Sequence, residues 1–497
     1  MVRGNIVRVA VLLPGLCAAA PLSAQTDHEP VGAADAAATI TAADLRDRIG
    51  ILADDSMRGR DTPSPELEQA ARYVAEQFRS FGLQPGNGDS YLQPYPLTLV
   101  GPGPVDRQAL RLRGPSDSRT LDPRTEFVAV PVGRALEGGG PLVRVDPSEE
   151  QADLTGRVAV ISVTPAALQR VFGRVRHILA ERGARGAILV VRAPAAYLAG
   201  IRRFFGRRRV SLGEPNDFPA PVMLVSASEL PSSLAEALRE ERPLPPGWSA
   251  VLRSDGEVEA ARGWNAIGWL EGSDPRLKHE YVLFTAHMDH VGVGRPVDGD
   301  SIYNGADDDA SGTATVVELA EAFARTTPRP RRSLIFMTVS GEEKGLFGSR
   351  WYTEHPLFPL ARTVADLNID MIGRNWRDTV VAIGKAESSL GPLVEEIAAA
   401  HPELHMAVVD DRWPDERFYF RSDHYNFARK GVPILFFFSG VHEDYHRPSD
   451  EPSKIEYGKT ARIGRLIYRL GRAVADADQK PRWDEQAYRR VVEGGDR

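Results

Sequence analysis

Five short segments of the sequence carry side chains that can bind metal ions or move protons. In the first, His287 and Asp289 directly follow an apolar run that predicts a strand over Tyr281–Ala286. A neutral imidazole can bind a metal ion while a nearby carboxylate holds its tautomer. We therefore predict His287 as a metal ligand and Asp289 as the residue that supports it.

Two further segments are acidic. Asp307, Asp308 and Asp309 are consecutive at the start of a helix-like pattern, and three adjacent carboxylates repel one another unless a cation compensates them. Helix capping accounts for one such acid but not for three. Glu342 and Glu343 follow another apolar strand. Two adjacent glutamates can have different roles, one binding a metal ion and the other transferring protons.

The last two segments also follow apolar runs. Asp370 ends an apolar strand, where a partly buried carboxylate needs a compensating charge. Tyr445 and His446 follow the aromatic run Phe436–Phe438. His446 can bind a metal ion, and Tyr445 can donate a hydrogen bond.

Strand, loop and helix patterns alternate from Asn265 onward. We expect a helix over Ala310–Arg325, and strands over Tyr281–Ala286, Ser333–Val339, Val364–Asp370 and Val432–Phe438. This order predicts an α/β fold, with a mixed, mostly parallel sheet sandwiched by helices. In such folds functional side chains gather beyond the carboxyl ends of the strands, which is where the five segments fall.

The residues before Asn265 divide into two kinds of segment. Thr41–Gly82 has apolar residues at helical spacing and predicts a core-facing helix that stops at Gly82. Residues 97–262 contain short apolar runs between Pro- and Gly-rich turns, which predict a β-rich unit. We expect this unit to be inserted into a catalytic domain made of residues 40–96 and 263–478. The order of its elements, with strands at Val158–Val163 and Ala187–Val191 around a helix, resembles the protease-associated (PA) domain.

The first 24 residues predict a cleaved signal peptide, because Arg3 and Arg8 accompany an apolar stretch that is too short to span a bilayer. We therefore expect a secreted or periplasmic protein without a stable membrane anchor. A lipid anchor at Cys17 is disfavoured by the bulky Leu16. Cys17 is the only cysteine, so the mature chain has no disulfide.

The overall charge and the charged segments point away from nucleic acid as a partner. The formal net charge of −7 argues against a generally nucleic-acid-binding surface. The basic run Arg202–Arg209 in the inserted unit is interpreted as a solvated loop. Residues 479–497 are interpreted as a polar C-terminal tail.

In order, spacing and flanking glycines, the five segments resemble the zinc aminopeptidase family with a co-catalytic dinuclear site (zinc exopeptidases). The resemblance implies two zinc ions per chain that are bridged by Asp308. It also implies Glu342 as general base, Asp289 as a supporting residue, and Tyr445 as a donor to the developing oxyanion. By the same resemblance, one ion is held by Asp308, Glu343 and His446, and the other by His287, Asp308 and Asp370.

The resemblance implies hydrolysis of N-terminal residues from peptides. Three alternatives stay open: a carboxypeptidase on the same scaffold, a single-zinc glutaminyl cyclase, and a non-catalytic receptor-like homologue. The presence of both His287 and Asp370 favours two metal ions and hydrolysis. His290, His424 and His442 are interpreted as neighbours of the motifs without a metal role.

Overall fold

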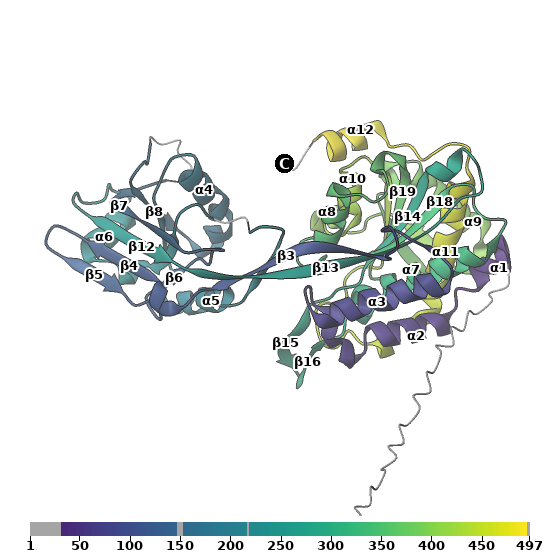
Figure 1. The fold of residues 1–497 in the computed structure, drawn as a ribbon, viewed down its shortest axis with the longest axis horizontal. Coiled ribbons are helices and arrows are strands. Elements are labelled where there is room, and N and C mark those ends of the chain that lie inside the picture. Colours follow the sequence, from purple (N-terminus) through teal and green to yellow (C-terminus); the bar gives the residue numbers. More distant parts are fainter. Residues whose placement is uncertain (1–30, 147–152, 216–217, 495–497) are drawn as a thin grey trace, which may run out of the picture.

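Two long antiparallel strands connect the two units of the chain (Figure 1). The structure is a computed structural model and describes residues 31–146, 153–215 and 218–494, so the predicted signal peptide and Cys17 lie outside the described residues. Strands β3 (Leu92–Pro102) and β13 (Gly256–Leu270) pair along their whole shared length. The predicted boundaries of the inserted unit, 96/97 and 262/263, fall inside these two strands.

A ten-stranded mixed sheet forms the centre of the larger unit. Its four middle strands, β18, β14, β19 and β22, are parallel, and antiparallel strands flank them on both sides. The predicted α/β fold with a mixed sheet between helices is therefore confirmed. The sheet order is β10 (Arg209–Leu212), β3, β13, β18 (Ser333–Val339), β14 (Tyr281–His287), β19 (Thr363–Ile369), β22 (Ile434–Phe438), β20 (Thr379–Ile383) and β21 (Ala407–Val409), with β2 (Gln84–Pro85) beside β13.

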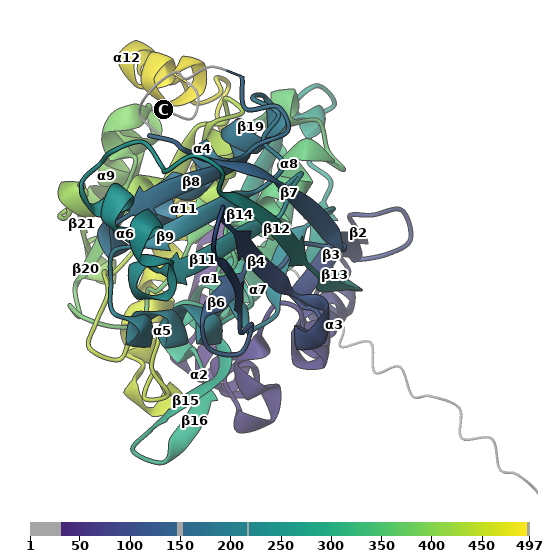
Figure 2. The same ribbon diagram turned by 90° about the vertical axis from the view of Figure 1, so that its left-hand side faces the viewer.

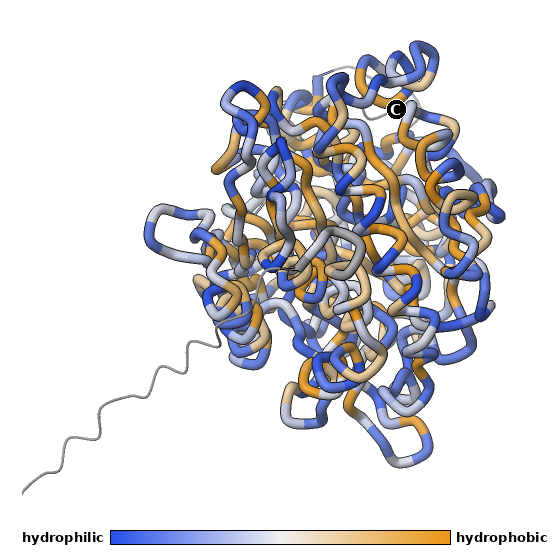
Figure 3. The backbone as a smooth tube through the Cα atoms, turned by 90° about the vertical axis from the view of Figure 1, so that its right-hand side faces the viewer, coloured by the Kyte–Doolittle hydropathy of each residue, from blue (hydrophilic) through white to orange (hydrophobic). Residues whose placement is uncertain are grey.

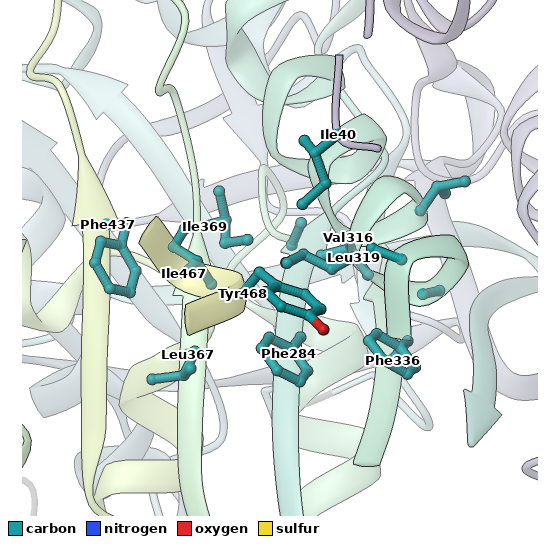
Figure 4. Close-up of a cluster of buried hydrophobic side chains, with 14 of the residues drawn as sticks. Ile40, Phe284, Val316, Leu319, Phe336, Leu367, Ile369, Phe437, Ile467 and Tyr468 are labelled. Carbon is teal, nitrogen blue, oxygen red and sulfur yellow. The ribbon is translucent and has the colours of Figure 1, made fainter. Parts of the chain in front are cut away.

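Helices cover both faces of this sheet because successive strand residues point to opposite sides. In β14, Val282 and Phe284 belong to one apolar core and Leu283 to the other. Figure 4 shows the first core, where strand residues such as Phe284 and Phe336 face Tyr468. This face carries α2 (Ala42–Leu52), α3 (Pro65–Ser80), α7 (Gly312–Arg325), α9 (Leu390–Ala400) and α11 (Tyr457–Asp476), whereas α8 (Phe347–Glu354) and α10 (His424–Ala428) lie on the other.

The hydropathy of the chain follows the same layering. Figure 3 shows hydrophobic stretches running through the interior and hydrophilic loops around them. Among the described helices, none combines the length and the apolar character that a membrane crossing requires. The smaller elements are β1 (Val31–Gly32) paired with β17 (Thr326–Thr327), the hairpin β15 (Gly292–Val297) and β16 (Asp300–Tyr303), and helices α1 (Ala33–Ala38) and α12 (Glu485–Tyr488).

The prediction of a single helix over Thr41–Gly82 is wrong. The segment forms α2 and α3, which are separated by a short 3₁₀ turn at Asp55–Arg60. Pro63 lies between them, and proline lacks the N–H group that a continuous helix needs. Ser64 then caps α3 by accepting a hydrogen bond from the N–H of Leu67.

The inserted unit has its own sheet (Figure 2). Two clusters of buried apolar residues pack within this unit. The strands at Val158–Val163 and Ala187–Val191 have the predicted bounds. Helices α4 (Leu168–Ala180), α5 (Ala195–Phe205) and α6 (Ser232–Arg239) accompany the sheet. The sheet order is β5 (Ser118–Leu121), β4 (Ala109–Arg113), β12 (Ser249–Ser254), β7 (Leu136–Arg144), β8 (Val158–Val163), β9 (Ala187–Val191), β11 (Val222–Ser226) and β6 (Phe127–Ala129).

Arg60 is a fully buried cation that ties the turn between α2 and α3 to the loops after β14 and before α7. Its guanidinium donates hydrogen bonds to the carbonyls of Met288 (2.7 Å), Asn304 (2.7 Å), Gly305 (3.0 Å) and Leu52. Replacing Arg60 by methionine would leave these carbonyls buried without this donor. We expect the free energy of unfolding in urea to fall by at least about 3 kcal/mol, because each unpaired buried group costs about 1–3 kcal/mol.

Arg58→Met is the matched control for this prediction. Arg58 lies two residues earlier, is largely exposed and pairs with Glu66 at 3.6 Å. Its replacement is expected to change stability by no more than about 0.5 kcal/mol. Equal losses for the two variants would contradict the structural role of Arg60.

Candidate metal centre

The five predicted segments converge at the carboxyl ends of the parallel strands. His287 is the last residue of β14, and Asp370 directly follows β19. Glu343 lies in the loop after β18, His446 in the loop after β22, and Asp308 in the irregular turn Ala306–Ser311 that precedes α7. Parallel strands bring these ends to one edge of the sheet, so residues far apart in the sequence face one another.

The first group of donor atoms surrounds the His287 imidazole. Its Nε2 atom lies 3.3 Å from Oδ1 of Asp308 and 3.6 Å from Oδ1 of Asp370. Its Nδ1 atom lies 3.1 Å from the carbonyl oxygen of Asp289 and 3.6 Å from Oδ1 of the same residue. A proton on Nδ1 satisfies Asp289 and leaves the Nε2 lone pair directed at the carboxylates, which is the orientation that a metal ligand needs.

The second group lies on the other side of Asp308. Nε2 of His446 is 3.2 Å from Oδ2 of Asp308 and 3.0 Å from Oε1 of Glu343. These three atoms are buried and have no hydrogen-bond partner among the described residues. Buried carboxylates without partners are costly, and a divalent cation would compensate them. Nitrogen and oxygen donors of this kind suit zinc.

His290 is the residue whose place the sequence analysis missed. We expected it to be only a neighbour of the first motif, but its Nδ1 atom lies 3.0 Å from Oε1 of Glu343 and 3.6 Å from Oδ2 of Asp308. One donor atom from each of His290, Asp308, Glu343 and His446 lies within 4.8 Å of the other three. The available signal was a second histidine three residues after His287.

Asp309 has a different environment from Asp308. Its carboxylate accepts hydrogen bonds from the backbone N–H groups of His287 (3.2 Å), Gly312 (2.9 Å) and Met371 (3.1 Å). Burial raises its pKa well above the ordinary value. Asp309 therefore joins three loops at the centre, whereas Asp308 directs its two oxygens at the two groups of donors.

Asp307 and Asp450 hold the acidic turn from its other side. Asp450 accepts hydrogen bonds from the backbone N–H groups of Asp307 and Asp308 at 3.1 Å. Asp307 accepts one from the N–H of Gly373 at 2.6 Å, and its other oxygen lies 3.3 Å from Nε2 of His442. No role for Asp450 was predicted from the sequence, because a single acidic residue in a loop forms no recognisable pattern.

Glu342 lies beside the two groups of donors, and its backbone N–H donates to Oδ1 of Asp289 at 3.3 Å. Burial raises the pKa of its carboxyl group well above the ordinary value, and the charge of Glu343 contributes. A buried carboxylate of raised pKa is suited to accept a proton. Glu342 lines a small pocket together with His287, Asp308 and Asp370.

The rest of this pocket is largely aromatic. The Tyr445 ring stacks on the His446 ring, with centroids 3.9 Å apart, and also lines the pocket. Arg421 reaches the same pocket and lies over the Phe418 ring at 4.7 Å. The wall is completed by Met371, Phe418, Ser422, Phe436, Phe438 and Val441.

Two of the remaining histidines near the motifs have structural contacts. His424 is buried, stacks on Phe436 and lies 2.8 Å, through its Nε2, from the carbonyl oxygen of Tyr419. Burial lowers its pKa to about 3, so it stays neutral. Nε2 of His442 lies 3.3 Å from Oδ2 of Asp307 without forming a hydrogen bond, and His442 is not among the donor groups described above.

The protonation of His446 predicts that zinc affinity depends on pH. Burial alone would lower its pKa, but contacts with Asp308 and Glu343 raise it to about 10 in the metal-free protein. Below that pKa, a zinc ion bound by His446 would have to displace a proton from it. The apparent affinity should therefore rise about tenfold per pH unit for each proton displaced. Chelator competition at pH 6, 7 and 8 measures this slope, and an affinity that does not change with pH would contradict it.

Comparisons with known proteins connect this centre to one family. Residues 265–471 match the model of peptidase family M28. The chain is 33% identical over 133 residues to a mouse protein, aminopeptidase NAALADL1. This match covers 26% of this chain and 16% of the mouse protein. The chain is also 31% identical over 159 residues to a probable glutamate carboxypeptidase of Arthroderma benhamiae. This match covers 30% of this chain and 18% of the fungal protein. The chain thus spans less than a fifth of the length of these two relatives.

One solved structure has the same fold over most of the chain. It is an aminopeptidase from Aneurinibacillus sp. strain AM-1, with a TM-score of 0.55 and 21% identity, and the match covers 90% of this chain and 97% of that chain. At this identity the likeness is one of fold.

Proposed function

We propose that the protein is a secreted or periplasmic zinc aminopeptidase, which the match of residues 265–471 to the model of peptidase family M28 supports. With two zinc ions bound per chain, the enzyme would remove N-terminal residues from peptides. The observation that carries the proposal is the position of Asp308, whose two carboxylate oxygens face two separate groups of donor atoms.

The proposed ligand sets follow from these two groups. One ion would be held by Asp308, Glu343 and His446, and the other by His287, Asp308 and Asp370. When bound, a pair of zinc ions activates a water molecule and polarises the scissile carbonyl.

The protein's own residues supply the proton transfer and the positioning. Glu342 would accept the proton of the attacking water and deliver it to the leaving amine, because its carboxylate lines the same pocket as the ligands. Asp289 would hold the His287 tautomer, which the position of its backbone carbonyl (3.1 Å from Nδ1) and of its Oδ1 (3.6 Å from Nδ1) supports. Tyr445 would donate a hydrogen bond to the developing oxyanion from the wall of the pocket.

The organisation of the chain fits such an enzyme. We propose that residues 40–96 and 263–478 form the catalytic domain, and that residues 97–262 form an inserted PA-like domain that restricts or guides substrate access. Residues 1–24 would be a cleaved signal peptide, and residues 479–497 a polar tail.

A carboxypeptidase is the second candidate, and one observation favours it. Arg421 lines the pocket beside the candidate ligands, where a guanidinium can bind a terminal carboxylate. One relative, which is described as a probable glutamate carboxypeptidase, also favours this candidate.

Hydrolysis of two substrate sets separates the candidates. The mature protein, loaded with two equivalents of zinc, is assayed on aminoacyl-p-nitroanilides with a free amine and on N-blocked dipeptides with a free carboxylate. Cleavage of the first set alone supports the aminopeptidase. Cleavage of the second set alone would establish the carboxypeptidase, and cleavage of neither by zinc-replete protein would overturn both.

A further inference from the structure

We propose that His290 is a fourth protein ligand at one of the two metal sites, so that the two sites differ in kind. The site of His290, Asp308, Glu343 and His446 would have four protein ligands and would hold its ion more tightly. The site that includes His287 would be open and exchangeable. This inference rests on the proposed two-metal function and extends it to an asymmetry between the ions.

The separations between donor atoms agree with one shared ion. Four donors at about 2.0–2.1 Å from a tetrahedral zinc ion lie about 3.3–3.4 Å from one another. Nδ1 of His290 lies 3.0 Å from Glu343 and 3.6 Å from Asp308, and Nε2 of His446 lies 3.0 Å and 3.2 Å from the same two carboxylates. The four separations therefore scatter around the value for tetrahedral ligands.

The hydrogen-bonding state of these atoms argues against a simple supporting role for His290. Its Nδ1 makes no hydrogen bond to a described residue although Glu343 is only 3.0 Å away. The same is true of Oδ2 of Asp308, Oε1 of Glu343 and Nε2 of His446. Four buried polar atoms that converge without satisfying one another point to a missing cation.

The His290 ring is also held in this position by its surroundings. The side chain is fully buried, and its backbone N–H donates to the carbonyl of Arg60 at 3.4 Å. A Cβ atom at Gly305 would lie only 2.5 Å from Cγ of the ring. The ring therefore fills the space above a glycine and points its nitrogen at the carboxylates, which is a preorganised ligand geometry.

The site around His287 has fewer protein donors. His287 approaches Asp308 and Asp370, and the second oxygen of Asp370 accepts a hydrogen bond from Ser422 at 2.8 Å. Asp309 is also close, but its two oxygens already accept three backbone hydrogen bonds. Three protein ligands leave a position for water or substrate, as in catalytic zinc sites, whereas four close a structural site.

The first test measures how tightly each ion is held. Wild-type protein and His290→Phe, which keeps a ring beside Gly305 but removes the donor, are dialysed against graded chelator concentrations and analysed for zinc. We expect wild type to keep one zinc ion after the other is lost. In His290→Phe the affinity of this retained ion should fall at least 100-fold. His355→Phe, at a ring that stacks on Trp351 away from the centre, is the matched control.

The second test needs no variant and covers the case in which His290→Phe fails to fold. X-ray absorption spectroscopy of wild-type protein with a single zinc ion counts imidazole ligands. We expect two, from His290 and His446. A count of one imidazole would overturn the inference. So would a His290→Phe protein that folds normally and binds its tighter zinc ion with unchanged affinity. These measurements do not use catalysis, so they are independent of whether the protein hydrolyses peptides.

Discussion

Replacing Glu342 by glutamine should reduce kcat on a cleaved aminoacyl-p-nitroanilide by about 10²–10⁴-fold while the zinc content stays at two ions per chain. The reason is that proton transfer by a positioned carboxylate contributes a factor of this size, and glutamine keeps the shape of the side chain without its basicity. Glu342 lines the pocket but belongs to neither group of candidate ligands. The loss should therefore appear in kcat and not in metal content.

Steady-state kinetics together with metal analysis on the same sample check this result. Glu354→Gln is the control, because Glu354 is an exposed glutamate at the end of α8 and should leave kcat unchanged. Retained kcat in Glu342→Gln would remove Glu342 from its proposed role. Loss of zinc from this variant would instead make Glu342 a ligand.

Replacing Asp308 by asparagine should abolish activity and lower the zinc content below one ion per chain. Its Oδ1 lies 3.3 Å from His287, and its Oδ2 lies 3.2 Å from His446. An amide offers only one oxygen and no charge, so one proposed site loses its Asp308 oxygen and the other keeps only a neutral, weaker donor. The metal-free fold should persist, because the substitution removes a buried carboxylate whose Oδ2 has no hydrogen-bond partner among the described residues.

The neighbouring Asp309→Asn provides the contrast. The amide nitrogen would replace an oxygen that accepts the N–H of His287, so two donors would face each other in a buried place. We expect the unfolding free energy of the metal-free protein to fall by about 1–3 kcal/mol. Urea unfolding and zinc analysis of both variants separate the two roles. Two ions retained in Asp308→Asn would contradict the bridging position.

Much of the fold and of the candidate centre could be predicted, because short runs of apolar residues identify the buried strands without knowledge of distant contacts. The bounds of β8, β9 and β18 agree with apolar runs, since a buried strand needs consecutive apolar residues. The convergence of His287 and Asp370 could be expected for a similar reason. Each comes at the end of such a run, and parallel strands place these ends at one edge of the sheet.

Other features were decided only by the tertiary structure. The burial of Arg60 depends on three carbonyls, those of Met288, Asn304 and Gly305, that lie more than 200 residues away in sequence. His290 and Arg421 reach the centre because of how their loops fold. The spacing of His290 from His287 suggested that it lies nearby, but the sequence does not give the direction of a loop side chain. The sequence by itself thus determined the residue types at the strand ends. Their distances, and the additional donors around them, were decided by how the loops pack.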